Sequence, residues 1–244
     1  MSRDKFDRLR RLRSIFEAIQ RWSPDRDLAA RRISAIDPFA QLVVVGEAVG
    51  PRTLRVSGVP YFDSQGSIGR TGKYLDEILK PLGYTVYPPR DIRVKLGKIS
   101  CSQGLGRKTA YCTDLCPTFP GYRRAPDGRL MIRPPSRDLV RSAIEQGFLH
   151  AELEVVDPKA ILLLGRNAYM YFYRYLLGVR RFPKLAAIVE GKGEIEFPRY
   201  RDAVVFPCFH PSPASPRFLR WFAEFGPCLL DIPLFQRLGE CLKD

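Results

Sequence analysis

Two short motifs place side chains capable of acid–base chemistry beside turn-forming residues. The first, GEAVGP at residues 46–51, sets Glu47 between Gly46 and Gly50, directly after an apolar run. Glycines at the carboxyl end of a strand allow the backbone to come close to a ligand. The second, HPSPAS at residues 210–215, sets His210 at the end of another apolar run. A carboxylate and an imidazole move protons and stabilise charge, so Glu47 and His210 are the first candidates for catalysis.

Each motif also has a plainer interpretation. A dinucleotide fingerprint is the rival for the first motif, but the spacing is not G-x-G-x-x-G and no helical pattern begins at the glycine turn. Glu47 can instead be a buried or helix-capping carboxylate. The second motif, taken by itself, is compatible with a rigid turn followed by a helix cap.

The side chains around these motifs belong to a strongly basic chain. Its 40 Lys and Arg against 26 Asp and Glu give a net charge of +14, and 30 of the 40 cations are Arg, which suits bidentate contacts with phosphate. A polyanionic partner, most simply nucleic acid, is therefore favoured. Hydrophobic residues make up 45% of the chain, which argues against a disordered basic tail, and 244 residues exclude a small disulfide scaffold.

Cysteine usage and the N-terminus indicate the compartment. Six cysteines occur without a C-x-x-C pair, and the N-terminus is a charged amphipathic run without an apolar signal region. No stretch of about 18 uncharged apolar residues is present, so no membrane span is predicted. We expect a cytoplasmic protein that does not contact membranes.

Four short apolar runs are typical of buried strands, because they are rich in β-branched residues and do not alternate with polar ones. Helical patterns separate these runs. The alternation predicts an α/β protein with a three-layer α/β/α sandwich and a central, mainly parallel four-stranded sheet. The strand runs are residues 42–46, 110–115, 160–165 and 203–209, and the helical patterns are residues 71–82, 136–155, 166–177 and 214–225.

The N-terminal segment has its own helical pattern. Residues 3–22 carry apolar side chains at helical spacing with Arg on the other faces, and Pro24 opens a second helical pattern to about residue 36. We therefore divide the chain into a helical extension, residues 1–37, and an α/β/α domain, residues 38–244. Two basic stretches, residues 88–108 and 117–135, adjoin predicted strand ends, where ligands bind in open α/β sheets, and are expected to be functional loops.

Together, and in this order, the two motifs resemble those of the uracil-DNA glycosylase superfamily. GEAVGP is similar to the GEAPG motif of the iron–sulfur family 4 enzymes, with Val49 in place of the proline, and HPSPAS is similar to the HPSP motif found elsewhere in the superfamily. Between them, Gly58, Pro60 and Tyr61 resemble the segment that stacks a ring on the flipped base, and residues 70–79 resemble the helix that follows. The resemblance covers about residues 41–220.

The resemblance implies a role for each matched residue. Glu47 would lie by the sugar and position water, and His210 would donate to the pyrimidine O2 as the base leaves. Tyr61 would stack on the base, although an apparent insertion after it leaves Phe62 as a substitute. The remaining implied contacts are Gly46 and Ala48 to the base, and Ser212, Ala214, Arg217 and Phe218 to the DNA.

One departure from family 4 concerns recognition of the base. The family has a Thr-Asn pair whose Asn recognises uracil, and the matching pair here is Thr113-Asp114. An ionised Asp only accepts hydrogen bonds, so it would face uracil O4 badly and a cytosine-like amino group better, unless burial keeps it protonated. The preferred base is therefore open at this point.

A second departure concerns the cluster. Family 4 uses four Cys ligands beginning with a pair near the N-terminus, whereas the first cysteine here is Cys101. Cys116 lies near a family position without matching its spacing, and Gln146 and Gly147 fall where a later ligand would be expected. We therefore expect no iron–sulfur cluster, no metal and no other cofactor.

These patterns lead to one expected activity and two rivals. The expectation is a DNA glycosylase that flips out and excises uracil or another deaminated base in base excision repair, with damaged DNA as its partner, no obligatory protein partner, and association with the nucleoid through DNA. Val49 and Asp114 favour the first rival, a damaged-base DNA-binding protein with little turnover. The second rival is a nucleotide-binding α/β protein unrelated to DNA.

Overall fold

The structure is a computed structural model of the chain. It describes residues 2–24, 36–50, 58–62, 67–89, 106–128, 130–191 and 196–243.

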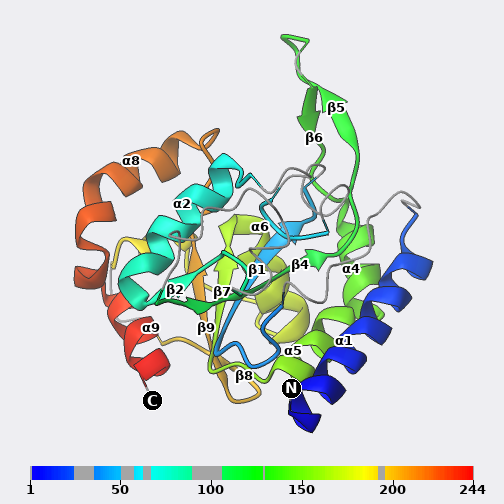
Figure 1. The fold of residues 1–244 in the computed structure, drawn as a ribbon. Coiled ribbons are helices and arrows are strands. Elements are labelled where there is room, and N and C mark those ends of the chain that lie inside the picture. The colour runs from blue at the N-terminus through cyan, green and yellow to red at the C-terminus, as the bar shows by residue number, and fades with distance from the viewer. Residues whose placement is uncertain are drawn as a thin grey trace.

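The centre of the molecule is a five-stranded sheet in the order β4-β1-β7-β9-β8 (Figure 1). The four predicted strands pair in parallel, and β8 runs antiparallel to β9 at the edge. The α/β prediction is confirmed, and the strand number of four is corrected to five. A strand of two residues is too short to leave a hydrophobic pattern. The strands are β1 Leu42–Ala48, β4 Tyr111–Cys116, β7 Ala160–Leu164, β8 Arg199–Tyr200 and β9 Ala203–Cys208.

The inner strands are apolar because the sheet is covered on both faces. Residues 42–45 of β1 and 160–163 of β7 are completely buried. In Figure 1, α1, α4 and α5 lie on one side of the sheet and α2, α8 and α9 lie on the other. A strand covered in this way needs apolar side chains on both of its faces, which produces continuous rather than alternating hydrophobicity.

The helices follow the predicted patterns with changes at their ends. The single helix expected over residues 136–155 is wrong: Gly147, with φ of 72°, ends one helix and starts another. Among the described segments, α7, α9 and η4 were not predicted. The helices are α1 Arg3–Trp22, α2 Arg70–Leu79, α4 Arg137–Glu145, α5 Phe148–Val156, α6 Gly165–Tyr171, α7 Leu185–Val189, α8 Pro216–Phe225 and α9 Pro233–Lys243, with shorter turns η2 Lys80–Leu82, η3 Phe172–Leu176 and η4 Gly226–Asp231.

The N-terminal helix is part of the main core. Leu12, Phe16 and Ile19 of α1 are buried in the same hydrophobic cluster as the sheet. Arg8 donates to the carbonyl oxygens of Val155, at 2.8 Å, and Val156, at 3.2 Å, and so binds the carboxyl end of α5. The second predicted N-terminal helix falls mainly on residues outside the described ranges, and the domain division at residue 37 stays a prediction.

Two small pairs of strands complete the fold. Strands β2, Tyr84–Thr85, and β3, Lys108–Thr109, are parallel, and β5, Tyr122–Arg124, and β6, Leu130–Ile132, form an antiparallel hairpin. The hairpin lies inside the stretch that we expected to be a loop. None of the described helices is both long and apolar enough to cross a membrane.

Strand order explains why distant motifs meet. In this sheet the chain passes from β1 to β4 on one side and from β7 toward β9 on the other, so the connections after the neighbouring strands β1 and β7 lead in opposite directions. A crevice opens at the carboxyl ends of the strands where the order reverses in this way. The motif GEAVGP begins within β1 and runs past its end, and HPSPAS follows β9, so both lie at this edge.

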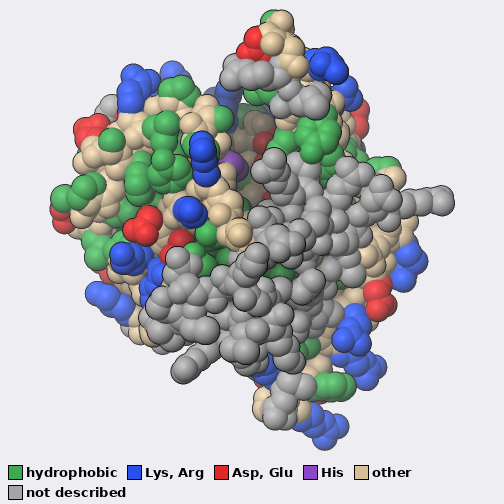
Figure 2. All heavy atoms as spheres, turned by 45° about the horizontal axis from the view of Figure 1, so that its top comes forward, with side chains coloured by type: hydrophobic (Ala, Val, Ile, Leu, Met, Phe, Trp, Pro, Cys, Tyr) green, Lys and Arg blue, Asp and Glu red, His purple; other side chains and the backbone are tan. Residues whose placement is uncertain are grey.

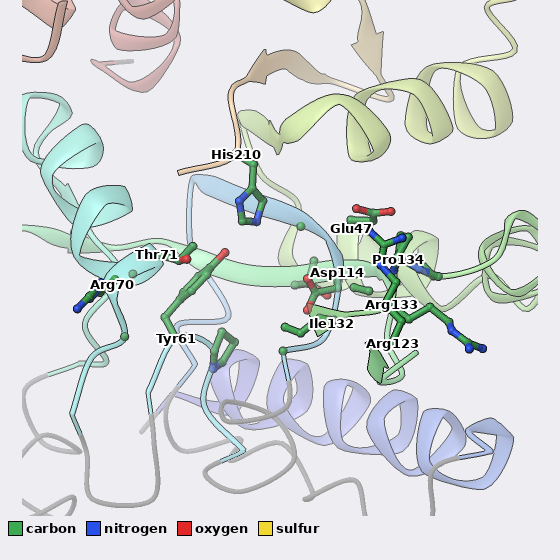
Figure 3. A pocket seen from close by; sticks show the side chains of 18 residues that line it. Glu47, Tyr61, Arg70, Thr71, Asp114, Arg123, Ile132, Arg133, Pro134 and His210 are labelled. Carbon is green, nitrogen blue, oxygen red and sulfur yellow. The ribbon is translucent and has the colours of Figure 1, made fainter. Parts of the chain in front are cut away.

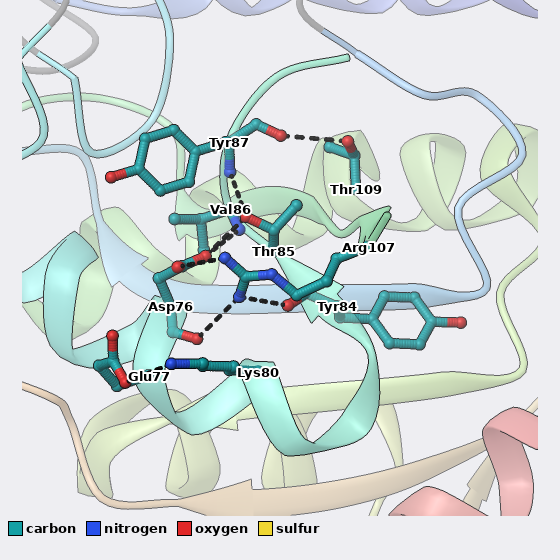
Figure 4. Close-up of polar contacts among 9 residues, drawn as sticks. All are labelled: Asp76, Glu77, Lys80, Tyr84, Thr85, Val86, Tyr87, Arg107 and Thr109. Carbon is teal, nitrogen blue, oxygen red and sulfur yellow. Dashed lines mark hydrogen bonds and ion pairs between the residues drawn. The ribbon is translucent and has the colours of Figure 1, made fainter. Parts of the chain in front are cut away.

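A buried ion pair fixes α2 to the strands beside it (Figure 4). Arg107 Nη2 lies 2.9 Å from Asp76 Oδ2, and Thr85 Oγ1 donates to Asp76 Oδ1 at 2.6 Å. Arg107 also donates to the carbonyl of Tyr84 at 3.0 Å. The Asp76 side chain is only 10% exposed, so the carboxylate depends on these donors for the hydrogen bonds that water would otherwise supply.

We expect Asp76→Ala to lower the free energy of unfolding by about 3 kcal/mol, because it leaves the Arg107 guanidinium buried without its partner. The next residue supplies the control: Glu77 is 58% exposed and lies 3.8 Å from Lys80, so Glu77→Ala should cost less than about 1 kcal/mol. Urea unfolding of the two variants measures the difference. Equal losses would mean that the buried pair does not stabilise the fold.

Candidate functional site

A cavity of about 550 Å³ opens at the carboxyl ends of β1, β4 and β9. Its size lies within the range of small-ligand sites. Figure 2 shows the hollow, with acidic side chains and a histidine inside it and Lys and Arg side chains around it. The sequence-predicted residues that line it are Gly46, Glu47, Ala48, Tyr61, Asp114 and His210.

Three of these side chains point into the same space. Figure 3 shows Tyr61, Asp114 and His210 directed into the cavity from three separate segments of the chain. Asp114 is on β4, where it pairs in register with Gly46 of β1. A Cβ atom at position 46 would collide with Asp114 Oδ1. Glycine is therefore needed in the first motif so that the Asp114 carboxylate can lie against the strand.

Glu47 is held by a residue that sequence reasoning missed. Asn167 Nδ2, on α6, donates a hydrogen bond of 2.7 Å to Glu47 Oε1. Burial raises the pKa of Glu47 from its ordinary value, and the bond from Asn167 opposes that rise. A donor to the carboxylate favours its ionised form and fixes its orientation. The only available signal was the place of Asn167 in the sequence, shortly after the third parallel strand.

His210 lies where another glycine makes room for it. A Cβ atom on Gly165, whose φ is 89°, would lie 2.9 Å from the Cβ of His210, closer than side chains pack. Solvent reaches His210 through the cavity mouth, while the walls around the imidazole remove part of its hydration and lower its pKa. The ring is thus neutral at pH 7, with one N–H available as a hydrogen-bond donor.

Tyr61 and Phe62 point in different directions. Tyr61 has φ of 67°, and its carbonyl accepts from Gly69 N at 2.8 Å. Gly72 is required beside it, because a Cβ atom there would lie 2.7 Å from the Cβ of Tyr61. Phe62 is only 1% exposed and packs edge-on against Tyr87, with ring centroids 5.4 Å apart. Of the two candidates for stacking, the structure brings Tyr61 alone to the cavity.

The residues that follow His210 mainly contact other residues of the protein. Ser212 Oγ accepts from Ala214 N at 3.2 Å. Arg217 lies 3.2 Å from Glu190 Oε1, with its guanidinium over the ring of Phe209. Phe218 is completely buried between Tyr74, Trp221 and Phe222. The structure therefore places Phe218 in the core, whereas Ala214 and Arg217 are at the surface.

Three arginines that the sequence did not single out as site residues also line the cavity. Arg70 begins α2, and Arg123 and Arg133 come from the β5–β6 hairpin. Cations around a cavity that holds carboxylates raise the local concentration of anionic ligands. Their signal was present in the basic composition of residues 117–135, but composition alone does not say which side chains face a cavity.

Removing Asn167 should change the pH dependence of any reaction that needs ionised Glu47. Activity falls as pH drops through the pKa of Glu47, which burial has raised, and Asn167 holds that pKa down. We therefore expect Asn167→Ala to move the acidic limb of the pH–rate profile to higher pH. In a Glu47→Gln background the same substitution should leave the profile unchanged. If the acidic limb of the pH–rate profile of Asn167→Ala stays where it is in the native protein, Asn167 does not lower the pKa of Glu47.

The cysteines that the structure describes do not fit an iron–sulfur cluster. Within the described ranges, no three His, Cys, Asp or Glu side chains come together as a metal site. Cys116 and Cys208 are buried, and burial raises the pKa of each thiol to about 12, which disfavours the thiolate that a cluster requires. Cys101 lies outside the described residues.

The expectation of a cofactor-free protein can be measured directly. Purified protein should be colourless, with iron and acid-labile sulfide far below one equivalent per chain and no absorbance near 400 nm. A brown preparation with stoichiometric iron and sulfide would contradict it.

Comparison with known proteins adds the family context. A sequence model described as the Uracil DNA glycosylase superfamily matches residues 33–226. The chain is also similar to the type-4 uracil-DNA glycosylase of Sulfurisphaera tokodaii, with 23% identity over 177 residues. That alignment spans 72% of this chain and 62% of the relative, less than two thirds of its length.

Proposed function

Since the chain belongs to the uracil DNA glycosylase superfamily, we propose that it is a DNA glycosylase that excises uracil or another deaminated base from DNA. The observation that carries the proposal is the meeting of Glu47 and His210, far apart in sequence, on the walls of one cavity with Tyr61 and Asp114. This is the set of groups that breaking a base–sugar bond requires: an anion, a donor, a stacking ring and a group to read the base edge.

The proposed reaction breaks the bond between the sugar C1′ and the base nitrogen. Positive charge develops on the sugar and negative charge on the leaving base. The Glu47 carboxylate, oriented by Asn167, stabilises the sugar cation and positions a water molecule that adds to C1′. The neutral His210 imidazole donates a hydrogen bond to the pyrimidine O2, and the water supplies the proton that the released base takes up.

The remaining groups hold the flipped base. Tyr61 presents its ring to the cavity and would stack on the base, while Asp114 would face the base edge. Gly46 and Ala48 supply backbone at the floor of the cavity. The net charge of +14 supports binding to the DNA backbone.

Base release tests the proposal. The protein is incubated with matched oligonucleotides carrying uracil, hypoxanthine, xanthine or a mismatched cytosine, and abasic sites are scored by alkaline cleavage. We expect abasic sites in at least one of these strands and none in an unmodified strand. Tight binding of a damaged oligonucleotide without any base release would favour the damaged-base binding protein instead.

A further inference from the structure

The β5–β6 hairpin projects from the body of the molecule (Figure 1), and three of its residues line the cavity. We call residues 121–128 and 130–133 the hairpin arm. Its base is closed by a hydrogen bond of 2.9 Å from Arg133 N to the carbonyl of Gly121, and its tip by one of 2.9 Å from Gly128 N to the carbonyl of Ala125. The arm is therefore a defined structural element with most of its surface open to solvent.

The arm combines exposed apolar side chains with unpaired cations. Tyr122, Met131 and Ile132 are 47%, 44% and 48% exposed, which makes them three of the seven most exposed large hydrophobic side chains in the described ranges. Arg123 and Arg124 form no ion pair with any described residue. Exposed apolar side chains gathered on one projecting element are typical of a surface that binds a partner.

The arm is continuous with the cavity. Arg123, Ile132 and Arg133 are among the residues that line it. Figure 3 shows the Arg123 side chain extending outward, away from Asp114. Tyr122 does not line the cavity, and its ring packs edge-on against Phe119 with centroids 5.0 Å apart. This contact holds the ring in place while leaving nearly half of the residue accessible.

We propose that the hairpin arm binds the unpaired DNA strand that carries the base in the cavity. Its arginines contact phosphates next to the flipped nucleotide, and Tyr122 stacks on a neighbouring base. Alternating cations and exposed rings are how proteins hold single strands, since every unpaired base offers a face for stacking. In a duplex those faces are already stacked, so Tyr122 and Met131 would find no partner. The inference rests on the proposed function for the identity of the strand.

The test uses two arm residues that do not line the cavity. Binding is measured by fluorescence anisotropy on a single-stranded oligonucleotide without uracil, over a range of salt concentrations. We expect Tyr122→Ala to weaken binding about fivefold or more with little change in the salt slope. Arg124→Ala should reduce the slope of log K against log[salt] by about 0.7, the value for one phosphate contact on a single strand.

Matched controls come from α1, where Phe6 is 55% exposed and Arg13 is exposed. Phe6→Ala and Arg13→Ala should change affinity less than twofold, and Tyr122→Phe should retain native affinity because it keeps the ring. Thermal unfolding checks that each variant is folded. On a fully paired duplex of the same sequence, Tyr122→Ala should bind within twofold of the native protein.

Two results would overturn the inference. One is single-strand binding within twofold of native for Tyr122→Ala together with an unchanged slope for Arg124→Ala. The other is an equal loss on single strand and duplex for Tyr122→Ala. Because the binding strand contains no substrate base, these outcomes are independent of turnover. If the native protein releases no base but the arm variants lose single-strand affinity, the proposed function fails and the arm still binds DNA.

Discussion

Glu47→Gln and His210→Ala should each lower the rate of base release by about 10² or more, while DNA affinity changes little. In the proposed reaction both side chains act mainly on charge that develops as the base–sugar bond breaks, so removing them would affect the transition state more than the bound ground state. Gln keeps the shape of Glu47 and can still contact Asn167, but it carries no negative charge to stabilise a sugar cation. Ala at position 210 removes the N–H donor that the proposed reaction directs at the leaving base.

The chain offers the same two substitutions at sites far from the cavity wall. Glu145 is on the surface of α4, paired with Arg141, and His150 is exposed on α5, bonded to Tyr200. Glu145→Gln and His150→Ala should leave base release within twofold of native. Single-turnover release from the best substrate, with anisotropy for affinity, measures all four variants. If both site variants released base at the native rate, the proposed active site would be wrong. If Glu47→Gln failed to fold, the role of Glu47 would be structural.

Much of the fold was readable from the sequence because the inner strands are covered on both faces. Continuous apolar runs at residues 42–46 and 160–165 have no other simple explanation in a chain of this size, and the structure has β1 and β7 there. The family resemblance had assigned Glu47 and His210 to one active site, and the parallel strands bring the two motifs to one edge of the sheet. The predictions were wrong where a single residue determines the local structure, as at Gly147, which separates two helices where one was predicted.

The rest of the site depends on tertiary contacts that leave little pattern. Asn167 reaches Glu47 because α6 packs against β1. The sequence shows only an Asn in a helix. Tyr61 and Phe62 are adjacent aromatics of similar character, and only the backbone conformation of Tyr61 decides which ring faces the cavity. Phe218 is a helix aromatic whose burial depends on Tyr74 and Phe222 from elsewhere in the fold.

Asp114→Asn should raise the release of uracil relative to every other base tested, by about tenfold. Asp114 lines the open cavity together with Arg123 and Arg133, and the expected gain holds for an Asp114 carboxylate that is ionised. An ionised carboxylate only accepts hydrogen bonds, and uracil O4 is also an acceptor. Two acceptors that face each other weaken the binding of uracil, and the amide N–H of Asn would restore a hydrogen bond to O4. Asn has the same shape as Asp, so the substitution requires no extra space beside Gly46.

A comparison with a carboxylate that does not line the cavity isolates this effect. Asp138 is exposed on α4, and Asp138→Asn removes the same charge without changing the cavity, so its base preference should equal that of the native protein. Release rates for uracil, hypoxanthine, xanthine and mismatched cytosine are measured for both variants over pH 5 to 9. A gain confined to uracil in Asp114→Asn identifies Asp114 as the residue that reads the base edge. Native uracil release that declines as pH rises would instead mean that Asp114 donates in its protonated form, and an unchanged preference would place it outside base recognition.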